Sequence, residues 1–359
     1  WPAGHYPRAT EFIPQMIQTI QKLEEKGFTY TTDDGSVFFK ISQFPAYGQL
    51  AHLDPEQLKS GERVAEDEYE KEEGRDFALW KGYKPTDGDV YWDSPWGKGR
   101  PGWHIECSAM STYYLGDHFD IHCGGVDNIF PHHENEIAQS CAASGEAFVN
   151  YWLHNEHLLV DNQKMSKSAG NFYTLRDLID KKCSLEAIRY TLISTHYRSK
   201  LNFTFDKVRT SQKCINKLCE LKRRLALVKK DKDAVVTGSV TDEMLSGFSQ
   251  KLGDDLNISG ALGELFTWVN DMFARLDGDE VNCDSAQQAI SALVKVDKVL
   301  GVMGRDKVEV DAGIQGLIDR RNQARKEKEW DEADVIREQL DEMGIVLEDT
   351  PEGTIWKKK

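Results

Sequence analysis

Residues 10–26 carry hydrophobic side chains at every third or fourth position, the spacing of one face of an α-helix. Thr10 is placed to cap the amino terminus of this helix, and Gly27 is expected to end it. Pro14 falls in the first turn, where a proline is tolerated. The polar residues in between leave the opposite face to solvent. The pattern predicts a packing helix without a chemical role.

Residues 28–39 change to short apolar runs on either side of Asp33-Asp34-Gly35, which is the pattern of a β-hairpin. Residues 62–74 are almost wholly charged and predict a solvated loop. A passage rich in glycine and proline follows over residues 97–102. We therefore predict that residues 28–96 form a small β-rich insertion within a larger domain.

The next segment has the order strand, glycine turn, helix. Residues 119–122 predict a short strand, residues 123–127 a tight turn with two adjacent glycines, and Pro131 the opening of a helix. An earlier helix is predicted to begin at Trp103 and to end before Gly116. Because α/β sheets present their ligand-binding edge in this order, we predict an α/β domain here.

The second half of the chain has mostly helical spacing. Residues 206–305 predict long amphipathic helices with polar linkers, and residues 314–343 predict a helical pair rich in arginine. Basic residues of the first region are Lys213, Lys217, Lys222, Arg223, Arg224, Lys229, Lys230 and Lys232. A basic helix face is most often simply solvated, but it is also where an acidic protein meets RNA phosphates. Basic residues interleaved with aromatic ones, up to Trp356, suit unstacked RNA bases.

Composition narrows the class of protein. The chain has 359 residues, enough for two or three domains, with 40% hydrophobic and 29% charged residues. No apolar run approaches the roughly 18 residues of a membrane-spanning helix, and no secretory leader is visible. The formal charge of −15 argues against a uniformly basic nucleic-acid binder. Seven irregularly spaced cysteines predict reduced thiols in a cytoplasmic protein.

Candidate chemistry is concentrated in residues 100–139. His132 and Glu136 are four residues apart, so they share one face of the predicted helix. With Cys107 they provide a thiolate, an imidazole and a carboxylate, each a good zinc ligand. A helix start with favourable acidic residues and a buried free cysteine would explain the same pattern without metal. Four nearby residues equally offer ligand atoms: His104, His122, His133 and Glu134.

Residues 161–171 form a second candidate site. Two lysines, Lys164 and Lys167, and two serines, Ser166 and Ser168, lie in a loop that ends in Gly170-Asn171. Such a loop can hold phosphate oxygens by charge and hydrogen bonds. Composition alone favours an ordinary solvated basic loop instead.

The motifs themselves are more specific than their composition. Lys164-Met165-Ser166-Lys167-Ser168 is identical to the KMSKS signature of class I aminoacyl-tRNA synthetases. Together with residues 102–108, the turn Gly124-Gly125-Val126-Asp127 and residues 130–136, it makes the chain resemble cysteinyl-tRNA synthetases. The resemblance covers essentially the whole chain, and four motifs in the right order do not match by chance.

The resemblance implies a reaction in two steps. Cysteine attacks the α-phosphate of ATP to give cysteinyl-adenylate and pyrophosphate, and the cysteinyl group then passes to the 3′ end of tRNA(Cys). Because charge grows on phosphate oxygens, catalytic roles are implied for Lys167 and Lys164. Residues implied to bind ATP are Lys167, Gly124, Gly125, Asp127, Ser166 and Ser168. Residues implied to bind substrate are Trp103, His122 and Asp127, with Trp103 as a wall of the pocket.

The resemblance also implies one Zn²⁺ per chain, held by Cys107, His132 and Glu136, and Mg²⁺ bound with ATP. An apolar pocket separates cysteine poorly from serine, whereas a thiolate–zinc bond is chemistry that a serine hydroxyl cannot match. Zinc would therefore remove the need for an editing domain, and no candidate for one is visible. The implied partners are ATP, L-cysteine and tRNA(Cys), for a cytoplasmic monomer that binds no membrane.

The implied architecture is a partial α/β Rossmann-like catalytic domain with a small β-rich insertion, followed by a helical bundle and a small anticodon-binding module. The predicted ranges are 1–27 with 97–160 for the catalytic domain, 28–96 for the inserted connective domain, 161–205 for the KMSKS loop and connecting domain, 206–305 for the tRNA-binding bundle and 306–359 for the carboxy-terminal module.

One feature departs from the family. Its HIGH signature and its first zinc cysteine match nothing here, since His5 is the only early histidine and no cysteine precedes Cys107. We therefore expect the sequence to cover the later part of a longer protein and to lack cysteine-dependent ATP–pyrophosphate exchange on its own. Two other functions stay open: a non-catalytic tRNA-binding homologue, and a ligase of the same superfamily that joins cysteine to an amino-sugar compound.

Overall fold

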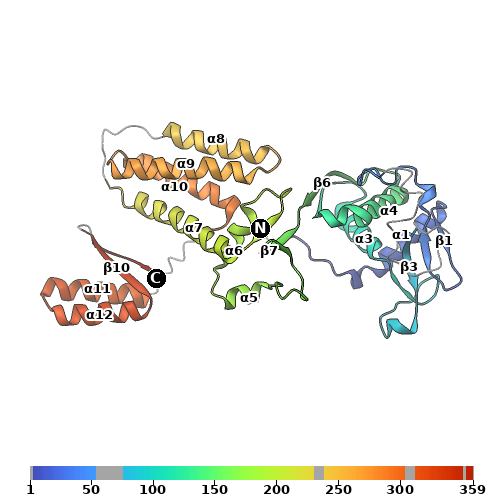
Figure 1. Ribbon diagram of the computed structural model, residues 1–359, viewed down its shortest axis with the longest axis horizontal. Helices are drawn as coiled ribbons and strands as arrows, with labels where there is room; N and C mark the ends of the chain where they lie inside the picture. Colours follow the sequence, from blue (N-terminus) through green and yellow to red (C-terminus); the bar gives the residue numbers. More distant parts are fainter. Residues whose placement is uncertain (1–2, 54–75, 230–237, 304–311, 351–352, 359) are drawn as a thin grey trace. The chain divides into compact units, whose positions relative to one another are not determined.

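The computed structural model describes residues 3–53, 76–229, 238–303, 312–350 and 353–358. The chain forms two compact units, which we call unit 1 and unit 2 (Figure 1). Unit 1 contains Trp1–Thr174, Leu192–Thr204 and Lys251–Ser259. Unit 2 contains Leu175–Thr191, Phe205–Gln250 and Gly260–Lys359. The charged loop predicted over 62–74 lies outside the described residues.

Helix α1 (Ile13–Glu25) confirms the predicted packing helix. Its apolar stripe, Ile13, Met16, Ile20 and Leu23, is buried. The predicted cap is wrong, because Thr10 lies inside a short 3₁₀ turn, η1 (Ala9–Glu11), and Phe12 occupies the N-cap position without a side-chain hydrogen bond. Burial of the stripe therefore positions this helix, rather than a capping side chain.

An antiparallel sheet follows, with the strand order β1-β2-β3-β4. Its strands are β1 (Thr29–Thr31), β2 (Val37–Phe39), β3 (Phe77–Gly82) and β4 (Gly99–Pro101), with short 3₁₀ turns η2 (Ile41–Gln43) and η3 (Pro85–Asp87). The predicted hairpin is confirmed, since Thr29 pairs with Phe39 and Thr31 with Val37. After β4 the chain passes so close to β3 that a Cβ at Gly102 would lie 1.9 Å from the Ala78 carbonyl oxygen.

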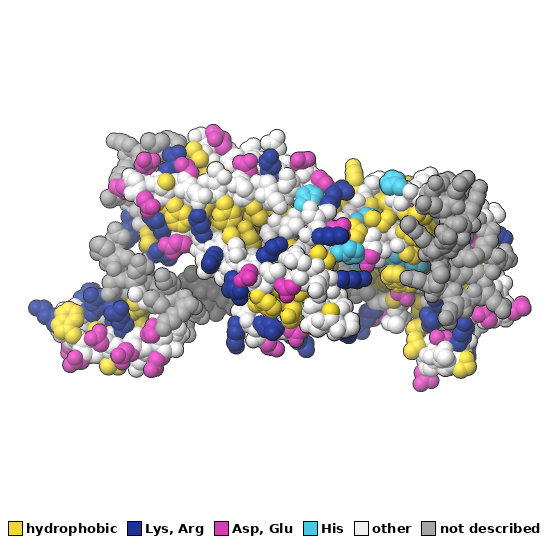
Figure 2. Space-filling view, in the orientation of Figure 1, with side chains coloured by type: hydrophobic (Ala, Val, Ile, Leu, Met, Phe, Trp, Pro, Cys, Tyr) yellow, Lys and Arg dark blue, Asp and Glu magenta, His cyan; other side chains and the backbone are white. Residues whose placement is uncertain are grey.

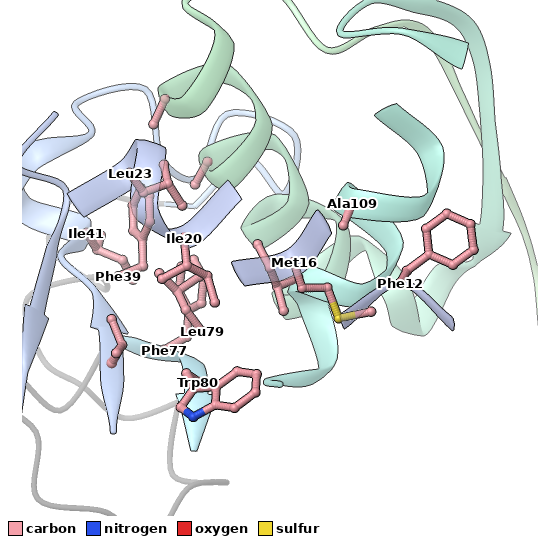
Figure 3. Close-up of a cluster of buried hydrophobic side chains, with 14 of the residues drawn as sticks. Phe12, Met16, Ile20, Leu23, Phe39, Ile41, Phe77, Leu79, Trp80 and Ala109 are labelled. Carbon is pink, nitrogen blue, oxygen red and sulfur yellow. The ribbon is translucent and has the colours of Figure 1, made fainter. Parts of the chain in front are cut away.

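This sheet and the helices around it share one hydrophobic core (Figure 3). Phe39, Phe77 and Leu79 from the sheet belong to the same buried cluster as Met16 and Ile20 of α1. Ile105, Ala109 and Ala138, from the helices described next, complete it. Each fully buried large side chain contributes about 1.5–3 kcal/mol, so the sheet of β1 to β4 is stabilised by packing against the rest of unit 1. The domain boundaries given by the sequence stay a prediction.

The α/β part of unit 1 begins with α3 (Trp103–Leu115), which ends at Gly116 as predicted. Strands β5 (Phe119–Gly125) and β6 (Val149–Asn155) pair in parallel, and α4 (Glu134–Ser144) connects them. Two short turns, η4 (Val126–Asn128) and the π-helical η5 (Ile129–His133), lead from β5 into α4. This β–α–β unit is the parallel crossover typical of α/β folds.

The glycine turn predicted after residue 122 is wrong. Gly124 and Gly125 continue strand β5, in register with His154 and Asn155 of β6. A side chain at Gly124 would meet His133, because its Cβ would lie 2.5 Å from His133 Cε1. The glycine is thus needed for close packing of an imidazole on the strand, and the chain turns only in η4.

The apolar segment before residues 161–171, which we call the lysine loop, contains the end of β6 and a second strand. After β6, strand β7 (Leu158–Val160) pairs in parallel with β9 (Leu201–Phe203) and antiparallel with β8 (Gln163–Lys164). The β7–β8 hairpin turns at Asp161 and Asn162, both with positive φ. Strand β8 ends at Lys164, so the rest of the lysine loop follows this strand directly.

Unit 2 is helical, as predicted. Its helices are α5 (Leu175–Asp180), α6 (Leu185–Ile193), α7 (Phe205–Ala226), α8 (Gly238–Gly253), α9 (Ile258–Asp277) and α10 (Cys283–Leu300). Helix α7 packs against α10 (Figure 1). Asn282 caps α10 by accepting a hydrogen bond from the Ser285 amide at 2.8 Å.

The carboxy-terminal part confirms the predicted helical pair. Helices α11 (Ala312–Glu327) and α12 (Trp330–Glu342) are followed by an antiparallel hairpin of β10 (Ile345–Thr350) and β11 (Gly353–Lys358). Ile318, Ile336, Leu340 and Ile345 form their own small core. In the part of the chain that the structure describes, no helix combines the length and apolar composition needed to cross a membrane.

Candidate active site

The three predicted metal ligands converge in unit 1. Cys107 comes from α3, His132 from η5 and Glu136 from α4, and one ligand atom of each lies within 4.8 Å of the others. His132 Nε2 lies 2.9 Å from Glu136 Oε1. Around a tetrahedral zinc ion with bonds of 2.0–2.3 Å, ligand atoms are about 3.3–3.8 Å apart. A small inward movement therefore suffices for these three residues to bind one ion.

The surroundings of Glu136 fit a cation. Its carboxylate is fully buried, and neither oxygen accepts a well-formed hydrogen bond, although His132 and His122 lie 2.9 and 3.5 Å away. A buried carboxylate left in this condition is costly unless a positive charge compensates it. Burial, followed by the charges of Glu136 and Glu106, raises the pKa of the Cys107 thiol to about 12. A divalent cation would compensate the charge of the Glu136 carboxylate and lower the pKa of the Cys107 thiol. The sulfur, nitrogen and oxygen of these three side chains are donors that zinc accepts.

Histidines surround these predicted ligands. Among the described residues, His122, His133 and Glu136 form a second group of potential ligand atoms within 4.8 Å of one another. His104 Nδ1 lies 2.9 Å from His132 Nδ1, on the side of the ring away from Glu136. Both His122 and His133 are thus placed to contact a cation near Glu136, whereas His104 contacts His132, which is itself a predicted metal ligand.

Burial favours the uncharged form of the neighbouring histidines His122, His133 and His154. His133 Nδ1 lies 2.8 Å from His154 Nε2, so one of these nitrogens donates and the other accepts. Burial, and then the charges of His122, His154 and His132, lower the pKa of His133 to about 3. The pKa values of His122 and His154 are lowered chiefly by burial as well. The pairing with His154, which lies in β6, was not predicted, because nothing in the spacing links the two positions.

Glu134 has a different role from its neighbours. Its buried carboxylate accepts hydrogen bonds from the amides of Gly48 and Ala51, at 2.7 and 3.0 Å. Beside it, Tyr47 donates from its hydroxyl to Asn135 Oδ1 at 2.5 Å. The first turn of α4 is thereby fastened to residues 47–51, and Glu134 is not available as a metal ligand. The sequence carried no signal for this contact across more than eighty residues.

Two of the predicted substrate residues, Trp103 and His122, lie beside the predicted metal ligands. The ring of Trp103, 54% exposed, stacks on His132 with centroids 4.2 Å apart. His122 Nε2 lies 3.5 Å from Glu136 Oε2, and the His122 ring centroid lies 4.7 Å from that of Trp152. Asp127 lies in η4, where its Oδ1 would be 2.3 Å from a Cβ at Gly125. The glycines of β5 therefore lie between the histidines and the Asp127 carboxylate.

The lysine loop is held by its own hydrogen bonds. Asn171 closes it, since its Oδ1 accepts from the Ser166 amide at 2.9 Å and its Nδ2 donates to the Lys164 carbonyl at 3.1 Å. Ser166 Oγ lies 3.3 Å from Ser168 Oγ and accepts from the Ala169 amide. Lys167 is exposed, with Nζ 5.6 Å from the centroid of Phe172. Across the residues described by the structure, these lysines contact none of the three predicted metal ligands.

Comparison with known proteins gives the same picture. Residues 1–213 match the model of the class I (C) tRNA synthetase catalytic domain, and residues 307–356 match the cysteinyl-tRNA ligase anticodon-binding domain. The cysteine–tRNA ligase of Brachyspira hyodysenteriae is 52% identical over 98% of this chain and 76% of its own length. That of Protochlamydia amoebophila is 46% identical over 99% of this chain and 76% of its own length.

Among solved structures, Mycobacterium tuberculosis methionyl-tRNA synthetase in complex with methionyl-adenylate superposes with a TM-score of 0.55 at 14% identity. The match covers 84% of this chain and 73% of that one, and it supports the class I catalytic fold alone. The fold class predicted from the sequence is therefore confirmed. The motifs, the fold and the two family models agree, and the chain belongs to the class I cysteinyl-tRNA synthetase family.

Proposed function

We propose that this chain is the cysteine-activating and tRNA-binding part of a cysteine–tRNA ligase, with Zn²⁺ selecting the substrate thiol. The observation that carries the proposal is the cluster of Cys107, His132 and Glu136, in which a fully buried carboxylate has no well-formed hydrogen bond. Such a cluster is costly to the fold without a cation. It is therefore best explained as the binding site of one.

In the first step a carboxylate oxygen of cysteine forms a bond to the α-phosphorus of ATP, and the bond from that phosphorus to the bridging oxygen of pyrophosphate breaks. Negative charge develops on the phosphate oxygens, which Lys167 and Lys164 stabilise from the lysine loop. Ser166 and Ser168 offer hydroxyl groups to the same oxygens. Mg²⁺ accompanies the ATP.

The nucleotide lies along the end of β5. Glycine at position 124 leaves room for the His133 ring and glycine at position 125 for the Asp127 carboxylate, which accepts hydrogen bonds from ribose hydroxyl groups. In the second step a ribose hydroxyl at the 3′ end of tRNA(Cys) attacks the cysteinyl carbonyl carbon, and AMP leaves with the electrons of the broken C–O bond.

Cysteine selection depends on the metal ligands and on the residues that hold them. When bound, Zn²⁺ supplies a soft Lewis acid that binds a thiolate in preference to a serine hydroxyl. Cys107, His132 and Glu136 would hold it, and Trp103 fixes the His132 ring by stacking at 4.2 Å. His122 and His133 lie beside Glu136, and burial, which lowers the pKa of both, favours the neutral form, which adds no positive charge to repel the ion.

The remaining partners follow from unit 2. We assign the basic side chains of α7 and the carboxy-terminal module to tRNA binding. We also propose that the protein is a cytoplasmic monomer. The match of residues 307–356 to an anticodon-binding domain favours tRNA over an amino-sugar acceptor, which has no anticodon. A purely tRNA-binding homologue would have no use for the metal ligands and the KMSKS loop together.

The test is charging of total tRNA with labelled cysteine by the full-length protein. We expect charging with cysteine but not serine, and one zinc per chain by elemental analysis. Lys167→Ala should lower cysteine-dependent ATP–pyrophosphate exchange by about 10²–10³-fold, whereas Lys22→Ala, which removes an exposed lysine of α1, should not. A fully folded, metal-free protein that still prefers cysteine would refute the role of zinc.

A further inference from the structure

Three residues separate the predicted metal ligands His132 and Glu136, which we call the ligand pair, and each of the three is held by residues distant in the sequence. On a helix with 3.6 residues per turn, His132 and Glu136 lie about 40° apart, whereas Glu134 points about 160° away from His132. The ligand pair therefore shares one side of the helix, and the residues between face other directions. The contacts of these intervening residues decide where the ligand pair lies.

Asn135 is held by a tyrosine from the segment after η2. The Tyr47 hydroxyl donates to Asn135 Oδ1 at 2.5 Å, and both side chains are buried. Burial, followed by the negative charges of Glu134 and Asp76, raises the pKa of Tyr47, so its hydroxyl keeps the proton that it donates. The contact joins residues 88 positions apart. Because a buried polar group that loses its partner is costly, this hydrogen bond fixes the distance between the two segments.

Glu134 is held by the same segment. Its carboxylate accepts from the amides of Gly48 and Ala51, at 2.7 and 3.0 Å. We call residues 47–51 the anchor segment, because they contact two successive residues of α4. Successive residues point about 100° apart around a helix. Two such contacts therefore resist rotation of α4 about its axis as well as movement of α4 away from the anchor segment.

His133 is held from another direction. Figure 2 shows histidine side chains at the surface of the molecule, whereas His133 is only 2% exposed. Its Nδ1 lies 2.8 Å from Nε2 of His154, in β6, and its ring packs on β5 at Gly124. The start of α4 is therefore held between the β5–β6 pair and the anchor segment. All of these contacts are made by residues other than the predicted ligands.

We propose that Tyr47, Glu134 and Asn135 are positioning residues of the metal site, which hold the ligand pair in the geometry that the ion needs. An ion binds more tightly to ligands that their surroundings already hold in place, because ordering loose ligands costs free energy. Cys107 lies on α3, so its distance from the ligand pair depends on where α4 is held. The inference rests on the proposed function, since it needs a metal at these ligands.

The first experiment measures the affinity of the full-length protein for Co²⁺ alone, from the absorption of bound Co²⁺ in competition with a chelator. Tyr47→Phe removes the donor and Asn135→Leu removes the acceptor, each at nearly constant shape. Each variant should weaken Co²⁺ binding about tenfold, the lower end of the effect of residues that orient metal ligands. If Tyr47 acts through Asn135, the double variant should bind Co²⁺ no more weakly than Asn135→Leu alone. A double variant with the sum of both losses contradicts this role of Tyr47.

Ser36→Ala is the matched control for the loss of a buried hydrogen bond. Ser36 is fully buried in unit 1, and its Oγ accepts from the Gly82 amide at 2.9 Å. The variant should lower the melting temperature, as Tyr47→Phe does, yet leave the affinity for Co²⁺ unchanged. An equal loss of affinity in Ser36→Ala and Tyr47→Phe means that general destabilisation explains both, and it overturns the inference.

The second experiment needs no variant. Coupling between two sites is reciprocal, so if the anchor segment favours metal binding, the metal stabilises the contacts of the anchor segment by the same factor. The Gly48 and Ala51 amides, which donate to Glu134, should therefore exchange about tenfold more slowly in the zinc-bound protein than in the zinc-free protein. Equal protection of these amides with and without zinc overturns the inference.

The two proposals fail in different ways. A folded wild-type protein that binds no Co²⁺ counts against the proposed function. Normal binding of Co²⁺ by the wild type, with the same affinity in Tyr47→Phe and Asn135→Leu, overturns the positioning role alone.

Discussion

The contact between Glu134 and residues 48–51 gives a local prediction that can be tested amide by amide. Glu134 is fully buried, and its two oxygens accept from different amides, Gly48 at 2.7 Å and Ala51 at 3.0 Å. Glu134→Gln keeps the shape of the side chain but turns one oxygen into an NH₂ group. That donor would then face a backbone donor, so one hydrogen bond becomes a repulsive contact.

The size of the effect is the loss of hydrogen bonding minus the cost of burying a charged carboxylate, which the glutamine avoids. A hydrogen bond to a charged group contributes about 1.5–3 kcal/mol, and leaving a buried donor unsatisfied costs about 1–3 kcal/mol. Burial raises the pKa of Glu134 while the backbone hydrogen bonds lower it, with burial the larger effect. A neutral glutamine avoids this cost of burying a charge, so we expect a net loss of about 1–3 kcal/mol. Glu134→Ala should cost more, because it also leaves a cavity.

The assay is hydrogen exchange of the Gly48 and Ala51 amides, supported by urea unfolding. Exchange at these amides should accelerate by about 5- to 150-fold in Glu134→Gln, which corresponds to the loss of about 1–3 kcal/mol. Glu146→Gln, at an exposed position just after α4, is the matched control and should stay within about 0.5 kcal/mol of the wild type. Unchanged protection of both amides in Glu134→Gln would show that the carboxylate does not hold this segment.

Three further predictions concern the candidate site. Cys107→Ser should abolish the thiolate charge-transfer absorption of the cobalt-substituted protein and lower the zinc content below one per chain; an unchanged spectrum would exclude Cys107 as a ligand. Gly124→Ala should destabilise unit 1 by about 1–3 kcal/mol, because its Cβ would lie 2.5 Å from His133; an unchanged melting temperature would contradict the tight packing. The pKa of His133 is lowered from 6.5 to about 3, so the unfolded chain binds its proton first as the pH falls. Stability of the metal-free protein should therefore be complete above about pH 6.5 and decline toward pH 3, and His133→Asn should flatten this decline in thermal melts.

The sequence by itself determined the helices and the chemical identity of the site. Helix α1 follows from an apolar stripe that only a helical period explains, and the same holds for α7 to α10. Contiguous motifs gave the family, since a string such as Lys164–Ser168 needs no tertiary information to be identified. His132 and Glu136 shared a helix face by spacing alone, and the structure places them 2.9 Å apart.

Tertiary structure decided everything that joins distant segments. Whether Gly124 and Gly125 lie in a turn or a strand depends on parallel pairing with β6, which a single segment cannot reveal. The assignment of Glu134 to the amides of residues 48–51, rather than to a metal, depends on a contact across 86 positions. Local periodicity reports only which face of an element is apolar. What that face meets, and which buried polar group receives which partner, is fixed when the segments pack together, because each buried donor and acceptor must then be satisfied in three dimensions.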